Sequence, residues 1–153
     1  MKKTLAALIC ASTIMGGAMA ENIVRTPAPG NFPISTVVEV PSAVKTYYLS
    51  GVVPAKQEDG TFGNTEAQTV SVLKGIEAQL KAKGLEMSDI VKMQVYLVTD
   101  PAVGKMDFDG FMKGYSQFFG TEAQPNTPAR SAFEVKALYL PEWFVEIEVI
   151  AVK

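Results

Sequence analysis

The sequence predicts an α+β fold, a two-layer sandwich in which two helices pack on one face of a mixed β-sheet. Two observations lead to this class. Several segments alternate apolar and polar residues, which is typical of strands, and two others repeat apolar residues at helical spacing. In chain order the segments are strand, strand, helix, strand, helix, strand, strand. No internal repeat or second domain is visible in the 153 residues.

Residues 1–20 have the pattern of a secretory signal peptide. Two lysines precede an apolar run from Leu5 to Met15, and Ala18-Met19-Ala20 forms an A-x-A cleavage site. The run is too short for a membrane span, and Cys10 does not follow the small residue that a lipoprotein signal requires. We therefore expect no membrane anchor, and a single mature domain of residues 21–153 that is periplasmic or secreted.

The composition excludes several kinds of chemistry. The chain has no histidine, so a His-based triad, an imidazole base and His-ligated zinc are ruled out. Its single cysteine lies in the expected signal peptide, and no glycine-rich phosphate loop is present. Without the two lysines of the signal, the formal net charge falls from −2 to about −4, which argues against nucleic-acid binding. The chemistry must use Arg, carboxylates, hydroxyls, backbone groups and water, and we expect no metal and no cofactor.

The first part of the mature chain predicts two strands after an arm. Asn22 to Pro33 is rich in proline and glycine and is expected to be an extended arm or loop. Residues 36–40 and 46–53 are rich in β-branched and aromatic residues, which favour strands. Residues 54–64, with two glycines, are expected to form a loop.

The clearest helical pattern begins at Thr65. Thr65 and Gln68 have the spacing of a capping box, and Gly84 is a typical C-terminal stop. Residues 90–98 then alternate as a strand, with the apolar face formed by Val91, Met93, Val95 and Leu97.

A second helix is expected from Asp107 to Phe119. Its stripe of aromatic residues and Met112 is interpreted as core rather than as a cofactor site. Gly110 and Gly114 each weaken an isolated helix by about 1 kcal/mol relative to Ala. Tertiary packing must therefore hold this helix.

Residues 128–153 contain two alternating runs joined by a short connection with Pro141, which predicts a hairpin of two strands. The more apolar side of each run is assigned to the core, and this places Arg130 and Glu146 together on the outer face of the sheet. The apolar sides are Ser131, Phe133, Val135 and Ala137 in the first run, and Val145, Ile147, Val149 and Ala151 in the second.

The outer face of the second run mixes two carboxylates with Phe144 and Ile150. Large apolar residues rimmed by charge often mark a partner surface, so an oligomer contact is one interpretation. The other is a solvated antiparallel face with weak cross-strand ion pairs. The pattern alone leaves both open.

The same residues resemble the C-terminal signature of the RidA family, also called YjgF/YER057c/UK114. The resemblance rests on Pro128-Ala129-Arg130-Ser131, Glu134-Val135, Leu140-Pro141, Glu146-Ile147-Glu148 and Ile150-Ala151-Val152. Upstream it includes Leu49-Ser50-Gly51 with Pro54, Asp89-Ile90-Val91-Lys92, and Tyr115 with Phe118-Phe119. It covers nearly all of the chain after about residue 30.

The resemblance implies a homotrimer of chorismate-mutase-like fold with ligand clefts between subunits. It implies hydrolysis of 2-imino acids or their enamines to 2-oxo acids and ammonia. Arg130 would clamp the carboxylate of a 2-imino or 2-oxo acid, and Glu146 would orient water, with Ser50 and Gly51 lining the cleft. The alternatives are an interface ion pair for Arg130, a charge partner for Glu146, and an ordinary strand residue and a bulge at Ser50 and Gly51.

Three positions depart from the family pattern. Ile34 stands where deaminating members usually have Tyr, Ala132 where they often have Cys, and Met112 where they have Asn. Ala132 still supplies a backbone carbonyl, but the cleft would be more apolar than usual. Two further hypotheses therefore remain, a noncatalytic protein that binds small carboxylates and a chaperone-like interaction protein.

Overall fold

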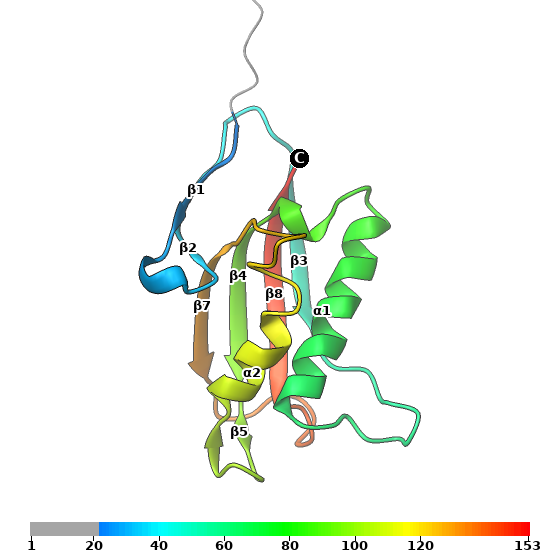
Figure 1. The fold of residues 1–153 in the computed structure, drawn as a ribbon. Coiled ribbons are helices and arrows are strands. Elements are labelled where there is room, and N and C mark those ends of the chain that lie inside the picture. Colours follow the sequence, from blue (N-terminus) through cyan, green and yellow to red (C-terminus); the bar gives the residue numbers. More distant parts are fainter. Residues whose placement is uncertain (1–21) are drawn as a thin grey trace, which may run out of the picture.

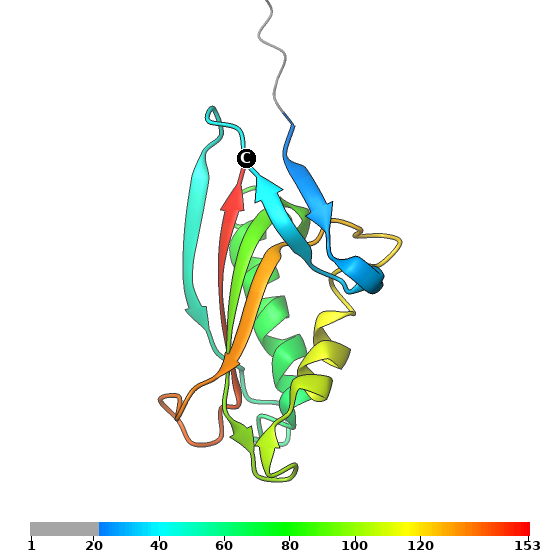
Figure 2. The same ribbon diagram turned by 90° about the vertical axis from the view of Figure 1, so that its left-hand side faces the viewer.

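The computed structural model describes residues 22–153, so the expected signal peptide lies outside the described residues. Six strands form one mixed sheet in the order β1-β2-β7-β4-β8-β3, and the helices α1 and α2 lie on the same face of it (Figure 1). Figure 2 shows the sheet from the side, with both helices behind one face and the other face open. The predicted α+β class is confirmed. Among the described residues, no helix combines the length and apolar character needed to cross a membrane.

The sheet is built around β4, which pairs parallel with β7 and antiparallel with β8. β7 also pairs parallel with β2, whereas β1 with β2 and β3 with β8 are antiparallel. The six strands are β1 (Val24–Pro27), β2 (Ser35–Glu39), β3 (Thr46–Val52), β4 (Ile90–Leu97), β7 (Ala129–Glu134) and β8 (Val145–Val152). Two further strands, β5 (Thr99–Asp100) and β6 (Lys105–Met106), form a small separate hairpin.

The predicted C-terminal hairpin is wrong, because β4 lies between β7 and β8. Met93 of β4 is aligned with Arg130 on one side and with Val149 on the other. After β4 the chain returns through α2 and enters β7 parallel to β4, which leaves the other edge of β4 free for β8. Two alternating runs that follow one another need not be neighbours in the sheet.

Helix α1 (Thr65–Lys81) covers the middle of the inner face but begins differently from the prediction. Asn64 is the N-cap, and its side chain accepts a hydrogen bond from the Ala67 N–H at 2.9 Å. Thr65 instead donates to the buried Asp100 carboxylate at 2.9 Å. Gln68 is fully buried and does not reach back to the cap. Both side chains form hydrogen bonds that connect loops to the helix, and they therefore do not form the predicted capping box.

Helix α2 (Phe108–Tyr115) is shorter than predicted and crosses close to α1. Asp107 is its N-cap and accepts from the Gly110 N–H at 2.9 Å. A Cβ at Gly114 would lie 2.7 Å from the Thr69 Cβ and 2.9 Å from the Glu66 carbonyl oxygen. Gly114, which would weaken α2 as an isolated helix, therefore allows the two helices to approach each other closely.

Gly114→Ala is expected to destabilise the fold by about 1–3 kcal/mol, although alanine is the better helix former. The added methyl group meets a backbone oxygen that cannot move without shifting α1. Denaturant unfolding of the variant beside Lys113→Ala, an exposed neighbour on α2, measures the difference. The control is expected to change stability by no more than about 0.5 kcal/mol. An increase in stability for Gly114→Ala would contradict the close packing.

The segment expected to be an arm contains β1 and a turn, and Arg25 fastens it to the sheet. The Arg25 guanidinium donates to three backbone carbonyls: Ser88 at 2.9 Å, Ile90 at 3.0 Å and Thr127 at 2.8 Å. Burial lowers the pKa of Arg25, and these carbonyls replace the water that is lost. This anchored strand leads directly into the segment that contains Phe32, Pro33 and Ile34.

Candidate functional site

Arg130 faces the helices, which corrects the prediction that it shares the outer face with Glu146. It is aligned with the fully buried Met93, and its guanidinium carbon lies 4.4 Å from the ring centroid of Tyr115 and 4.9 Å from that of Phe111. The more apolar side of β7, including Phe133, faces outward instead. A planar guanidinium stacks well on aromatic rings, so this position on the inner face of β7 suits arginine.

Two more aromatic rings and a thioether complete the surroundings of Arg130. The guanidinium carbon is 5.4 Å from the Phe32 centroid and 5.9 Å from the Phe108 centroid. Nη1 lies 3.3 Å from the Met112 sulfur, a weak acceptor. The sequence pattern assigned the aromatic residues of α2 only to the core, so their contacts with Arg130 were not predicted. The available signal was Met112, which belongs to that stripe and stands where the family pattern has Asn.

The charge of Arg130 has no carboxylate partner within the described part of the chain. The only ion pair within 4.0 Å among residues 22–153 joins Lys81 and Glu77, at 2.9 Å. Glu134, on the same strand as Arg130, accepts a hydrogen bond from Thr99 at 2.5 Å. A half-buried cation without an anion is costly, and a ligand carboxylate would remove that cost.

Arg130 and Tyr115 shift each other's ionisation. Burial lowers the pKa of the Arg130 guanidinium, and the Tyr115 phenol partly opposes this. Burial also raises the pKa of Tyr115 far above its ordinary value, against the influence of Arg130. At neutral pH the pair is therefore a charged guanidinium over a neutral phenol.

The N-terminal segment is held beside this site. The Tyr115 hydroxyl donates to the Pro33 carbonyl at 2.8 Å, which fixes Ile34 next in the chain. Ala132 lies on the same face of β7 as Arg130 and packs against the core. Of the predicted site residues, Arg130, Met112 and Ala132 therefore lie together on the inner side of the sheet. Ile34 follows Pro33, whose carbonyl is bonded to Tyr115 of the same site.

Glu146 and Gly51 form a second group on the open face. Glu146 is aligned with Tyr96 of β4, and its carboxylate lies against Gly51 of β3, in the space that a Cβ at Gly51 would fill. The pairing of β3 with β8 shifts between Leu49 and Val52, so Ser50 and Gly51 form the bulge considered from the sequence. The absence of a side chain at Gly51 is what allows Glu146 to lie flat there.

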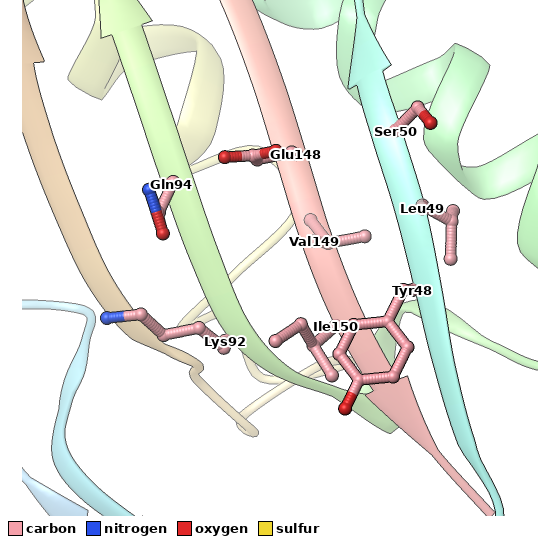
Figure 3. A pocket seen from close by; sticks show the side chains of 8 residues that line it. All are labelled: Tyr48, Leu49, Ser50, Lys92, Gln94, Glu148, Val149 and Ile150. Atoms are coloured by element: carbon pink, nitrogen blue, oxygen red, sulfur yellow. The ribbon is translucent and has the colours of Figure 1, made fainter.

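Ser50 lines a shallow pocket of about 330 Å³ on the open side of the sheet (Figure 3). Lys92 and Gln94 of β4, Glu148 of β8 and Tyr48 of β3 also line it. The Tyr96 hydroxyl donates to Glu148, which raises the Tyr96 pKa. Arg130 lies on the opposite, inner face, so the sheet separates its guanidinium from Ser50, Gly51 and Glu146.

Comparison with known proteins identifies the family. The family model described as Endoribonuclease L-PSP matches residues 33–153. The chain belongs to this family, which is also called RidA or YjgF. The 2-iminobutanoate/2-iminopropanoate deaminase of Salmonella typhimurium is 34% identical over 137 residues, 88% of this chain and 99% of that protein.

Solved structures of RidA-family proteins share the fold. The Rid protein YyfB of Yersinia pestis matches with a TM-score of 0.66 and 27% identity, over 87% of this chain and 100% of that one. E. coli TdcF with bound serine matches with a TM-score of 0.59 and 31% identity, over 84% of this chain and 94% of that one. The RidA-like architecture expected from the sequence is thus confirmed.

Proposed function

We propose that this protein hydrolyses 2-imino acids or their enamines to 2-oxo acids and ammonia. The observation that carries the proposal is the Arg130 guanidinium, which has no carboxylate partner among residues 22–153 and is held on aromatic rings. The relative named as an imine deaminase and the relative solved with serine, a small carboxylate, support it.

Arg130 binds the carboxylate of the substrate. A guanidinium can donate two parallel hydrogen bonds to a carboxylate and stays charged at neutral pH. The protonated imine carbon is then attacked by water, which gives a carbinolamine. Transfer of a proton to its nitrogen and collapse of the C–N bond release ammonia and leave the 2-oxo acid. Glu146 holds the attacking water and accepts its proton.

Both residues can act on one substrate only if the site combines two subunits. Arg130 and Glu146 of one chain point to opposite faces of the sheet. The open face also exposes large apolar side chains, with Tyr48 78% and Phe133 41% exposed. A homotrimer that covers this face would bring Glu146 of one subunit to Arg130 of the next.

The departures from the family pattern leave this chemistry possible. Met112 takes only one weak hydrogen bond from Arg130, so the remaining N–H groups are available to a carboxylate. Ala132 keeps its backbone carbonyl. The description of the matched family as an endoribonuclease finds little support in this chain, which has no histidine and a net charge of −2.

The proposal is tested with residues 21–153 and 2-imino acids generated in situ by an amino-acid oxidase. Release of 2-oxo acid or ammonia is compared with the spontaneous reaction, across small, branched and aromatic substrates. Acceleration by the protein supports the deaminase. Without acceleration the deaminase proposal falls, and thermal stabilisation by 2-oxo acids would then indicate the noncatalytic carboxylate-binding protein.

Gly51→Ala is expected to lower kcat by about 10–100-fold with little change in stability, because the new methyl group displaces the Glu146 carboxylate. Only the end of a flexible side chain has to move, so the fold tolerates the change. Steady-state kinetics and a melting curve measure the two effects. Thr46→Ala, at an exposed position of the same strand and away from the bulge, is the control. Equal activity of Gly51→Ala and wild type would show that the position of Glu146 does not matter.

A further inference from the structure

We propose that Phe32 is a specificity-determining residue, which covers Arg130 and selects ligands whose side chain is apolar. The inference rests on the proposed function, since it concerns the same carboxylate site. The resemblance to the RidA family does not single out Phe32. It lies on the other side of Pro33 from Ile34, the position where the usual Tyr is missing.

A tight turn places the Phe32 ring over the guanidinium. Gly30 and Asn31 both have positive φ, 69° and 57°, which reverses the chain after β1. The Ile34 N–H donates to the Phe32 carbonyl at 2.7 Å. The Ala28 N–H donates to the Ile34 carbonyl at 3.0 Å, which closes the turn. The ring then lies 5.4 Å from the Arg130 guanidinium carbon, within cation–π range.

The turn is anchored to the floor of the same site. Pro33, directly after Phe32, accepts the hydrogen bond of the Tyr115 hydroxyl, and the Tyr115 ring stacks on Arg130. Phe32 is therefore held in place through Tyr115, the residue whose ring stacks on the Arg130 guanidinium. At 39% exposed, the ring still has a surface to offer a ligand.

The wall that Phe32 forms is apolar throughout. Phe108 and Met112 flank the guanidinium on the α2 side, and neither offers a strong hydrogen-bond partner. The usual Tyr would place a hydroxyl near the substrate, whereas the aromatic cover here has none. A polar ligand side chain placed against this wall loses water without a replacement, but an apolar one gains by burial. The favoured class is 2-imino acids with branched or aromatic side chains, over those derived from serine or aspartate.

The first arm of the test measures turnover. For wild type, kcat/KM for the leucine-derived imine is expected to exceed that for the serine-derived imine by about 10-fold or more. Phe32→Ala is expected to reduce this ratio to about one, mainly by slowing the leucine-derived substrate. Phe32→Tyr should keep the ring and partly restore the serine-derived substrate. Phe62→Ala, a half-buried loop aromatic that packs against Trp143, is the control and should keep the wild-type ratio.

The second arm measures binding without turnover, by calorimetry with 4-methyl-2-oxopentanoate and pyruvate. Wild type is expected to bind the branched acid about 10-fold more tightly than pyruvate, and Phe32→Ala is expected to lose that preference. If no imine is hydrolysed but this preference exists and depends on Phe32, the deaminase proposal falls and the present one stands. A wild type without preference, a preference that survives Phe32→Ala, or no binding of either acid would overturn it.

Discussion

Arg130→Ala is expected to lower kcat/KM for 2-imino acid hydrolysis by about 10²–10³-fold while the melting temperature stays the same or rises. The activity falls because the substrate carboxylate loses the guanidinium that binds it. The stability should not fall, because removal of a half-buried cation without a carboxylate partner among residues 22–153 offsets the cation–π contacts that are lost. Steady-state kinetics and a melting curve on the same preparations measure both quantities.

Arg25 provides a matched control, since it is another half-buried arginine whose pKa is lowered by burial. Its guanidinium is satisfied by three backbone carbonyls. Arg25→Ala should therefore destabilise the fold by about 2–4 kcal/mol, as expected when hydrogen bonds to a charged group are lost. If Arg130→Ala proved as destabilising as Arg25→Ala, then Arg130 would be a structural residue, and its effect on activity would say nothing about substrate.

The alternation of strands and the apolar spacing of helices predicted much of the fold, because each depends only on which face of its own segment is buried. The alternation in residues 90–98 and in Val145, Ile147, Val149 and Ala151 gave the buried face of β4 and β8 correctly. Both are paired along most of their length on two sides, and their covered inner face forces a clear contrast between the two sides of the strand. The first helix was also predicted, although not its cap, because Asn64 and Thr65 are both common N-cap residues and only Thr65 has the capping-box spacing to Gln68.

The site was harder to predict because it depends on which strands pair and which side of β7 is covered. An apolar count placed Phe133 inside and Arg130 outside, but β7 pairs with β2 only at Ala129, so its edge from Arg130 onward is open on that side. There the aromatic rings of α2 and Phe32 form a surface that suits a guanidinium better than an aliphatic side chain. The resemblance to the family identified Arg130 and Glu146, but the geometry that relates them required the three-dimensional arrangement.

Two inactive variants are expected to restore activity when they share an assembly. Arg130→Ala and Glu146→Gln each remove one half of the proposed site. If each site combines Arg130 of one subunit with Glu146 of the next, a mixed trimer contains sites in which both residues are intact. Each mixed trimer has both residues intact in one of its three sites, so trimers purified through both tags should have about one third of the wild-type number of sites. Co-expression with two different affinity tags and purification through both tags yields the mixed trimers for the imine assay.

The control is the mixture of the two variants purified separately and combined under conditions where subunits do not exchange, which should stay inactive. The test discriminates because the two side chains lie on opposite faces of the sheet within one chain. A site that lay within one subunit would always carry one of the two substitutions, so co-expression could not rescue it. Activity that remains at the level of the single variants would therefore refute the shared cleft. It would leave Arg130 as a carboxylate site whose water must be held by another group.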